Sequence, residues 1–205
     1  MTVLDTIKDE HRLIRRYLDN MEIATDFVHE GESVPEEVFT LFHDFSKTFM
    51  DDFHHFKEEY VLFLKLAEKK GGTIDPQIVS LRDQHERGRN FLKKITKAVP
   101  RYLQKDESAT ATLSENMGYF VLLQKQHLNR ENHVFIPMAR ETFSKEELQE
   151  FADEFKKQDE NLGAEIHKKS EAQVDQIAKL LKEQFSSRYR DKLELIQKTR
   201  AHGDE

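Results

Sequence analysis

The sequence contains no cysteine and no tryptophan, and its 205 residues include only 4 prolines and 7 glycines. Without cysteine the chain has no disulfide, thiolate metal site, iron–sulfur cluster or thiol nucleophile, so histidine and carboxylates are its only strong metal ligands. The scarcity of proline and glycine favours long helices joined by few loops. Hydrophobic residues (37%) suffice for a core and charged residues (35%) for a dense surface charge, which excludes a disordered chain.

Positive charge is also scarce, since 32 lysines and arginines stand against 39 aspartates and glutamates, a formal net charge of -7. This sign disfavours binding to nucleic acid through phosphate contacts and binding to an anionic membrane surface. No apolar run has the length of a membrane span, and residues 1–18 lack the apolar stretch of a signal peptide. We therefore expect no nucleic-acid or membrane partner and a cytoplasmic location.

Helical periodicity extends over four long stretches, and no strand pattern competes with it. Thr2 and Asp5 form a capping box at the start of the first stretch, and Pro100 is expected to end the third. The predicted helices cover residues 3–28, 35–69, 75–100 and 113–140. Four long helices with short or polar connections indicate an all-α fold, an up-down-up-down four-helix bundle.

The residues after the bundle are expected to form one or two additional C-terminal helices. Ser144 and Glu147 match a capping box that starts a fifth helix, and apolar periodicity over residues 172–198 indicates a sixth. We predict the bundle in residues 1–143 and a C-terminal helical extension in residues 144–205. The extension packs on the outside of the bundle or mediates a homodimer.

Polar side chains interrupt the apolar seams of three bundle helices. His11 lies between Ile7 and Ile14 in the first helix, and His85 occupies a matching position in the third. His127 and Glu131 occupy consecutive seam positions in the fourth. A single histidine in such a position is most often a hydrogen-bonded core residue, but several at one level of a bundle indicate a shared site.

The second helix offers two overlapping HxxxE pairs, His54 with Glu58 and His55 with Glu59. At about 100° per residue, the phenylalanine-rich face of this helix includes His55 and Glu59, whereas the other pair projects to the opposite side. The spacing i, i+4 places a histidine and a glutamate on one face, where both can reach the same metals. We therefore select His55 and Glu59 and assign His54 a structural or surface role.

The selected residues lie at one level of the bundle. At about 1.5 Å per residue, they all lie roughly 12–18 Å from the same end of an antiparallel bundle. Burying carboxylates and imidazoles costs several kcal/mol per charged group without a counter-charge. Two bridged cations would supply that charge, and the sulfur-free ligands suit iron first, then manganese or zinc. The predicted ligands are His11, His55, Glu59, His85, His127 and Glu131.

Four motifs carry these residues in the order H…HxxxE…H…HxxxE: DEHRLIRRYL, FHHFKEEYVLF, QHERGRNFL and HLNRENHVFIPMA. In this combination, over residues 1 to about 143, the chain resembles the hemerythrin-like, or HHE cation-binding, domain family. The resemblance implies that His11 and His55 bind one iron and that His85 and His127 bind the other. It also implies that Glu59 and Glu131 bridge the two irons together with an oxo or hydroxo group.

The chain departs from the oxygen carriers of this family in two helices. Those proteins show HxxxH in the third helix and HxxxxD in the fourth, whereas here Arg89 replaces the second histidine and the fourth helix reads HxxxE. The resemblance therefore implies an additional open position at the metals, with space beside Gly88. Asp52 and Gln124 are expected to accept hydrogen bonds from imidazole N–H groups.

The leading hypothesis is a non-haem di-iron protein that binds O2 or a related small ligand such as nitric oxide or peroxide. Whether it turns over a substrate, as an oxidase or a peroxidase, stays open. The alternative is a metal- or redox-dependent sensor of iron or oxygen that acts on a partner without turnover. A third hypothesis is a bundle without metal, in which the histidines serve only the core.

Overall fold

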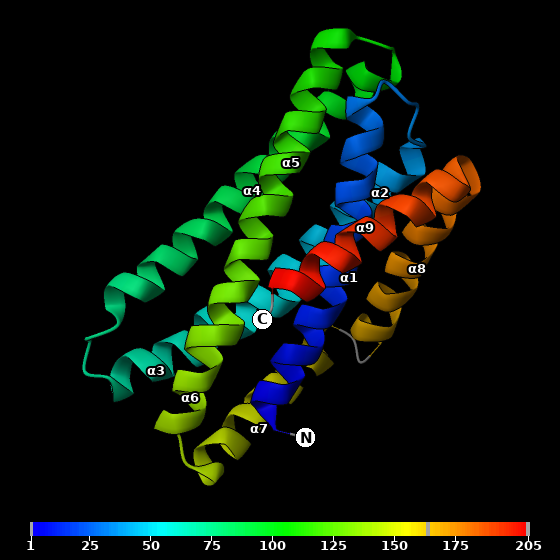
Figure 1. The fold of residues 1–205 in the computed structure, drawn as a ribbon. Helices are drawn as coiled ribbons and strands as arrows, with labels where there is room; N and C mark the ends of the chain where they lie inside the picture. The colour runs from blue at the N-terminus through cyan, green and yellow to red at the C-terminus, as the bar shows by residue number, and fades with distance from the viewer. Residues whose placement is uncertain (1, 163–164, 204–205) are drawn as a thin grey trace.

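The computed structural model describes residues 2–162 and 165–203. Every regular element within these residues is a helix and none is a strand, which confirms the all-α fold. Four long helical segments run alternately in opposite directions and three further helices cover one side of them (Figure 1). None of the described helices is long and apolar enough to cross a membrane.

The first helix of the bundle, α1 (Val3–His29), begins as the sequence predicts. The Thr2 backbone N–H donates to the Asp5 carboxylate at 2.8 Å, and the Asp5 backbone N–H donates to the Thr2 hydroxyl at 3.3 Å. This capping box satisfies two N–H groups that the helix itself cannot pair. One face of α1 is fully buried and carries His11 among its aliphatic residues.

The second helix of the bundle is continuous but changes its winding along its length. It consists of α2 (Glu36–Phe45), η1 (Ser46–His55), η2 (Glu58–Leu62) and α3 (Phe63–Lys69), of which η1 and η2 are π-helical. In a π-helix each N–H pairs with the carbonyl five residues back rather than four. Side chains that follow a π-helical turn therefore point in directions that an α-helical projection does not predict.

The third helix, α4 (Asp75–Leu103), continues past the proline that we expected to end it. Pro100 lacks a backbone N–H, which removes one helical hydrogen bond. The last turn is held by Tyr102, whose hydroxyl donates to the Glu32 carbonyl at 2.7 Å and accepts from the Val34 N–H at 2.8 Å. The prediction of an end near Pro100 was wrong because this tertiary contact outweighs the local effect of proline.

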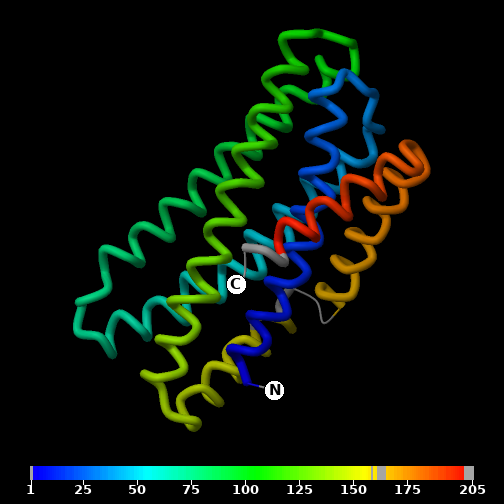
Figure 2. Tube along the Cα trace, viewed as in Figure 1, coloured from blue at the N-terminus to red at the C-terminus, as the bar shows by residue number. Residues whose placement is uncertain are grey.

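The fourth helix is also continuous and contains one π-helical turn. It consists of α5 (Glu107–Arg130), η3 (Glu131–Phe135) and α6 (Ile136–Thr142). Asp106 caps its start by accepting the N–H groups of Ser108 and Ala109. The helix packs against both α1 and α4 and so closes the bundle (Figure 2).

The apolar core of the bundle forms two clusters, one on each side of the buried histidines. In α1, Ile7 belongs to one cluster and Leu13 to the other, with His11 between them. In the second helix, Phe53 and Val61 likewise belong to different clusters and bracket the histidine pair. A polar layer therefore crosses an otherwise apolar core at one level.

The chain after the bundle forms α7 (Lys145–Leu162), α8 (Ile166–Phe185) and α9 (Ser187–Gly203). The predicted capping box is present, with reciprocal hydrogen bonds between Ser144 and Glu147 at 2.9 and 3.2 Å. The extension packs against the outside of the bundle, where α8 contacts α1 and α2 and α9 contacts α1.

The periodicity over residues 172–198 predicts one helix, but the structure divides this segment at Ser186, which has a left-handed φ of 51°. Both sides of the turn are anchored on α1. The Phe185 ring stacks on Phe27 with 3.7 Å between centroids, and the Tyr189 hydroxyl donates to Asn20 at 2.8 Å. Contacts with α1 therefore favour the turn at a position with no glycine or proline signal, and α9 lies across α1 as a result (Figure 2).

Candidate metal centre

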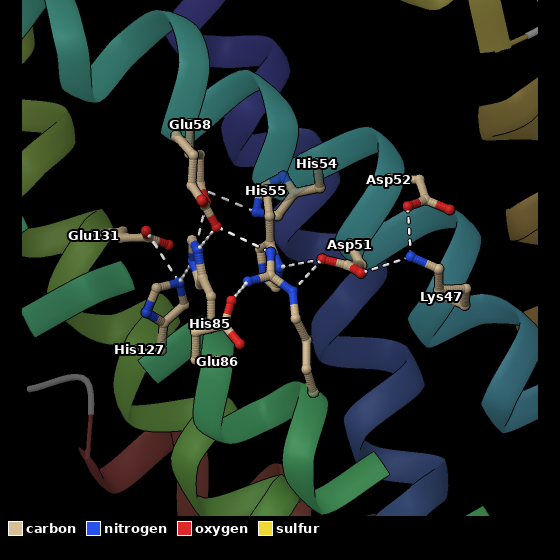
Figure 3. Close-up of polar contacts among 12 residues, drawn as sticks. Lys47, Asp51, Asp52, His54, His55, Glu58, His85, Glu86, His127 and Glu131 are labelled. Atoms are coloured by element: carbon tan, nitrogen blue, oxygen red, sulfur yellow. Dashed lines mark hydrogen bonds and ion pairs between the residues drawn. The ribbon is translucent and has the colours of Figure 1, made fainter. Parts of the chain in front are cut away.

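Seven buried side chains from all four bundle helices form two adjacent groups that could each hold a cation. Figure 3 labels those of the second, third and fourth bundle helices: His54, His55, Glu58, His85, His127 and Glu131. In each group the ligand atoms lie within 4.8 Å of one another. One group contains His55, Glu58, His85 and His127, and the other contains His11, His54, Glu58 and Glu131. Glu58 belongs to both groups, so its two carboxylate oxygens can join two cations.

Glu131 also spans the two groups. Its Oε2 lies 3.4 Å from His11 Nε2, and its Oε1 lies 3.1 Å from His127 Nε2. Glu58 shows the same division, with Oε1 at 3.4 Å from His11 Nε2 and Oε2 at 3.6 Å from His85 Nε2. Two carboxylates that each face both groups would both contact cations held in either group.

Several buried polar atoms at the centre have no hydrogen-bond partner among the described residues. They are His54 Nε2, Glu58 Oε2 and both carboxylate oxygens of Glu131. An unpaired buried oxygen or nitrogen is costly in an apolar core. These lone pairs converge on the interior of the cluster, where cations would satisfy them, so the donor set fits a pair of metal ions.

The protonation of the imidazoles suits metal binding. Burial lowers the pKa of His54 to about 3 and the pKa values of His55 and His85 to about 4, so these rings are neutral at pH 7. Burial also acts to lower the pKa of His11, but the neighbouring carboxylates of Glu131 and Glu58 raise it to about 10, so this ring would release a proton when a cation binds. Neutral imidazoles offer a lone pair, and the two carboxylates favour positive charge between them.

Hydrogen bonds from the outer ring nitrogens orient the imidazoles. Nδ1 of His54 donates to Glu10 at 2.8 Å, and Nδ1 of His85 donates to Glu59 at 2.6 Å. Two further contacts of this kind join His11 Nδ1 to Asn132 at 2.9 Å and His127 Nδ1 to Gln84 at 3.1 Å. Each acceptor is an oxygen, so Nδ1 is the donor in each case, and Nε2 faces the centre, where a neutral ring offers its lone pair to a cation.

The assignment of His54 and Glu58 to the outer face of their helix was wrong. Both are buried, with 0% and 1% of their surface exposed, and both belong to the candidate metal groups. The projection failed because η1 ends at His55 and η2 begins at Glu58, so the α-helical angle does not apply across this segment. His54 and His55 consequently both face the centre, although they are adjacent in sequence.

The structure brings five of the six predicted ligands into the two groups and places Glu59 outside them. Glu59 accepts from His85 Nδ1 and pairs with Arg89 Nη2 at 3.1 Å. Burial acts to raise the pKa of Glu59, but the hydrogen bond from His85 and the charge of Arg89 lower it to about 2. Glu59 therefore orients His85 through its outer ring nitrogen.

Among the described residues, neither of the two expected acceptors, Asp52 and Gln124, accepts a hydrogen bond from an imidazole. Asp52 is exposed and pairs with Lys47, while Asp51 lies 3.9 Å from His55 Nδ1 and binds Arg89 Nε at 2.7 Å. Gln124 lies beside Gly88, where an added Cβ would come within 2.5 Å of its amide nitrogen. The amide therefore occupies the space that we expected beside Gly88.

The acceptors that the sequence analysis missed are Glu10, Gln84 and Asn132, each adjacent in sequence to a residue of the metal groups. That adjacency is the one signal that could have found them.

Together the fold and the site define a helical-bundle protein with a buried histidine–carboxylate centre suited to cations. The chain belongs to the hemerythrin HHE cation binding domain family, whose model matches residues 2–139 and also residues 77–204. This confirms the resemblance drawn from the motifs.

Similar proteins include uncharacterized proteins from Mycobacterium tuberculosis (strains H37Rv and CDC 1551) and Mycobacterium bovis. Each is 26% identical over 155 residues, a match that covers 76% of this chain. The chain spans 60% of the length of these relatives. No solved structure matches the chain.

Proposed function

We propose that the protein is a non-haem di-iron protein in which His55, His85 and His127 bind one iron and His11 and His54 bind the other. Glu58 and Glu131 would bridge the two ions. The observation that carries this proposal is the sharing of Glu58 between two buried groups of ligands. A site that held one ion would not need two adjacent sets of unpaired donors.

Iron is favoured over other metals by the chemistry of the donors. The cluster combines imidazoles with carboxylates and has no sulfur, since the chain has no cysteine. Such ligands suit iron, and they also accept manganese or zinc. Bound iron would supply the capacity to bind O2, nitric oxide or peroxide and to change oxidation state.

The chain's own residues would control where such a ligand binds. Arg89 lies where oxygen carriers of the family have a histidine, and it pairs with Asp51 and Glu59 instead of facing the centre. The ion held by His55 and His85 would therefore keep a position for a small ligand. Glu59 and Gln84 hold His85 and His127 in the orientation that leaves this position free.

Metal analysis of two adjacent glutamate variants tests the ligand assignment. Glu58→Gln should lower the iron content from about two to less than one per chain, because both ions lose a charged ligand. Glu59→Gln should keep the stoichiometry and weaken iron binding by about 10–100-fold, as for a residue that only orients a ligand. Circular dichroism of both metal-free variants checks that they fold.

The opposite ranking, with iron lost in Glu59→Gln and kept in Glu58→Gln, would refute the assignment. His54→Ala provides a second comparison. An α-helical projection of the second helix predicts nearly normal iron content for this variant, whereas the proposed ligand set predicts a strong loss. Near-ultraviolet absorption in air and under reductant identifies an oxo-bridged ferric pair.

The two ion pairs of Lys57 favour a sensor as the second candidate function. Lys57 Nζ lies 2.6 Å from Glu10, the partner of His54, and 2.9 Å from Asp159 on α7. The centre is thereby connected to the C-terminal helices. A sensor should show redox-dependent hydrogen exchange in α7 and negligible turnover of peroxide or nitric oxide, whereas an oxidase or peroxidase should show turnover.

A further inference from the structure

A cleft of about 970 Å³ opens between η1 and α4 and reaches the candidate metal centre. His55 and His85 line its inner end, whereas His11, His54, Glu58 and Glu131 are not among its described lining residues. At the opposite end, His43 of α2 lies 3.1 Å from Thr96 of α4. Between His85 and Lys97 the cleft follows α4 for twelve residues, or about 18 Å.

The charge of this cleft is opposite to that of the whole chain. Among the described residues that line it, five are basic (Lys47, Arg89, Lys93, Lys94 and Lys97) and one, Asp51, is acidic. Asp51 is already paired with Lys47 and Arg89. The side chains of Lys93 and Lys97 are exposed and have no ion-pair partner within the described residues. A chain with a net charge of -7 therefore presents unpaired cations along one wall of a cleft.

One wall of the cleft is apolar. Met50 and Phe120 are each 2% exposed, and Leu92 is partly buried beside them. The volume far exceeds the roughly 30 Å³ that one water occupies, and it lies in the range of pockets that bind organic ligands. A diatomic molecule would leave nearly all of this space unfilled.

We propose that the cleft binds an amphipathic monocarboxylate, with its carboxylate at Lys93 and Lys97 and its apolar body directed toward His55 and His85. The elongated cleft matches the length of such a molecule, the lysines at its outer end match the carboxylate, and the apolar wall matches the hydrocarbon chain. This deepens the proposed function by naming the class of organic ligand that reaches the metal centre. Binding itself depends on residues outside the two metal groups, so it can be measured separately.

Calorimetric titration of the full-length, metal-free protein with hexanoate, octanoate and decanoate tests the proposal. Affinity should rise by up to about fourfold for each added methylene, because each one buries more apolar surface. The Lys93→Gln/Lys97→Gln variant should weaken decanoate binding by about five- to tenfold, as expected for two exposed charge contacts. Leu92→Asp, which places a negative charge in the apolar wall, should abolish binding.

Lys156→Gln/Lys157→Gln is the matched control, because it removes the same charge from exposed positions on α7, away from the cleft. It should leave the affinity for decanoate unchanged. The proposal is overturned if decanoate does not bind, if the two double variants bind it equally, or if inorganic phosphate binds as tightly as decanoate. Decanoate binding by a chain that takes up no iron would refute the di-iron proposal alone, and iron uptake without decanoate binding would refute this one alone.

Discussion

At the scale of single residues, the most unusual side chain is Lys57, which is fully buried at 0% exposure. Its ammonium group contacts Glu10 and Asp159 and lies 3.4 Å from the centre of the Phe53 ring. Burial raises the pKa of Glu10, and the charge of Lys57 opposes this rise. A buried charge is tolerated when it is paired, so the lysine offsets part of the cost of burying the carboxylate that orients His54.

Lys57→Met should destabilise the metal-free protein by about 3–5 kcal/mol, because it leaves Glu10 buried without its cation. Glu10→Gln/Lys57→Met should lower the free energy of unfolding by less, since the amide oxygen can still accept from His54 and Glu10 no longer carries an unpaired charge. Urea unfolding measures both values, with Lys156→Met as an exposed control expected within about 0.5 kcal/mol of the wild type. A double variant less stable than Lys57→Met would contradict this role.

At the scale of helices, the winding of the second bundle helix decides which histidines meet. The π-helical segments η1 and η2 lie on either side of Phe56 and Lys57, and their ends carry His54, His55 and Glu58. π-Helical turns are uncommon and often occur at functional sites. Here they turn both histidines toward the centre, which an uninterrupted α-helix would not do.

The start of α5 provides a pH-dependent prediction. Hydrogen bonds from Arg101 and from the Ala109 backbone N–H lower the pKa of Asp106 to about 2, from 3.8. Its contribution to stability is complete above pH 4 and is lost as the pH falls toward 2. Asp106→Asn retains an acceptor but no charge, so the gap in urea midpoint between the wild type and this variant should narrow from pH 5 to pH 2.5. A difference in urea midpoint that stays constant over this range would show that ionisation of Asp106 does not contribute to stability.

At the scale of the whole molecule, the bundle and the C-terminal helices share an apolar core. Val174, Ile177, Leu181 and Phe185 of α8 belong to the same buried cluster as the aromatic residues of α1 and α2. The division at residue 143 thus separates segments of the chain, while the core continues across it. Removal of the C-terminal helices would therefore expose apolar residues of α1 and α2.

A chain that ends at residue 143 should be less stable than the full chain by several kcal/mol, because each large apolar side chain of α8 contributes about 1.5–3 kcal/mol through burial. It should also self-associate through the exposed faces of α1 and α2. Thermal unfolding and size-exclusion chromatography measure both effects, with a chain that ends at Arg200 as the control. A monomeric, equally stable bundle of residues 1–143 would show that the predicted division is a true domain boundary.

The all-α fold, the helix starts at Thr2 and Ser144 and the membership of the hemerythrin HHE family are confirmed. These features depend on local periodicity, capping and motifs, which are properties of short stretches of sequence. The ligand set stays a prediction. His11, His85 and His127 could be selected from the sequence because they occupy apolar seam positions, which α-helical periodicity specifies directly.

Which residues of the two overlapping HxxxE pairs face the centre depends on the folded helix, because π-helical turns change the direction of side chains without a recognisable sequence signal. Tertiary structure also decided where α4 ends and where α8 turns, since Tyr102 and Phe185 are held by partners distant in sequence. The pairing of Lys57 with Glu10 and the cleft along α4 arise between helices. Local sequence patterns specify which chemical groups each helix carries, and the packing of the helices specifies which of these groups meet.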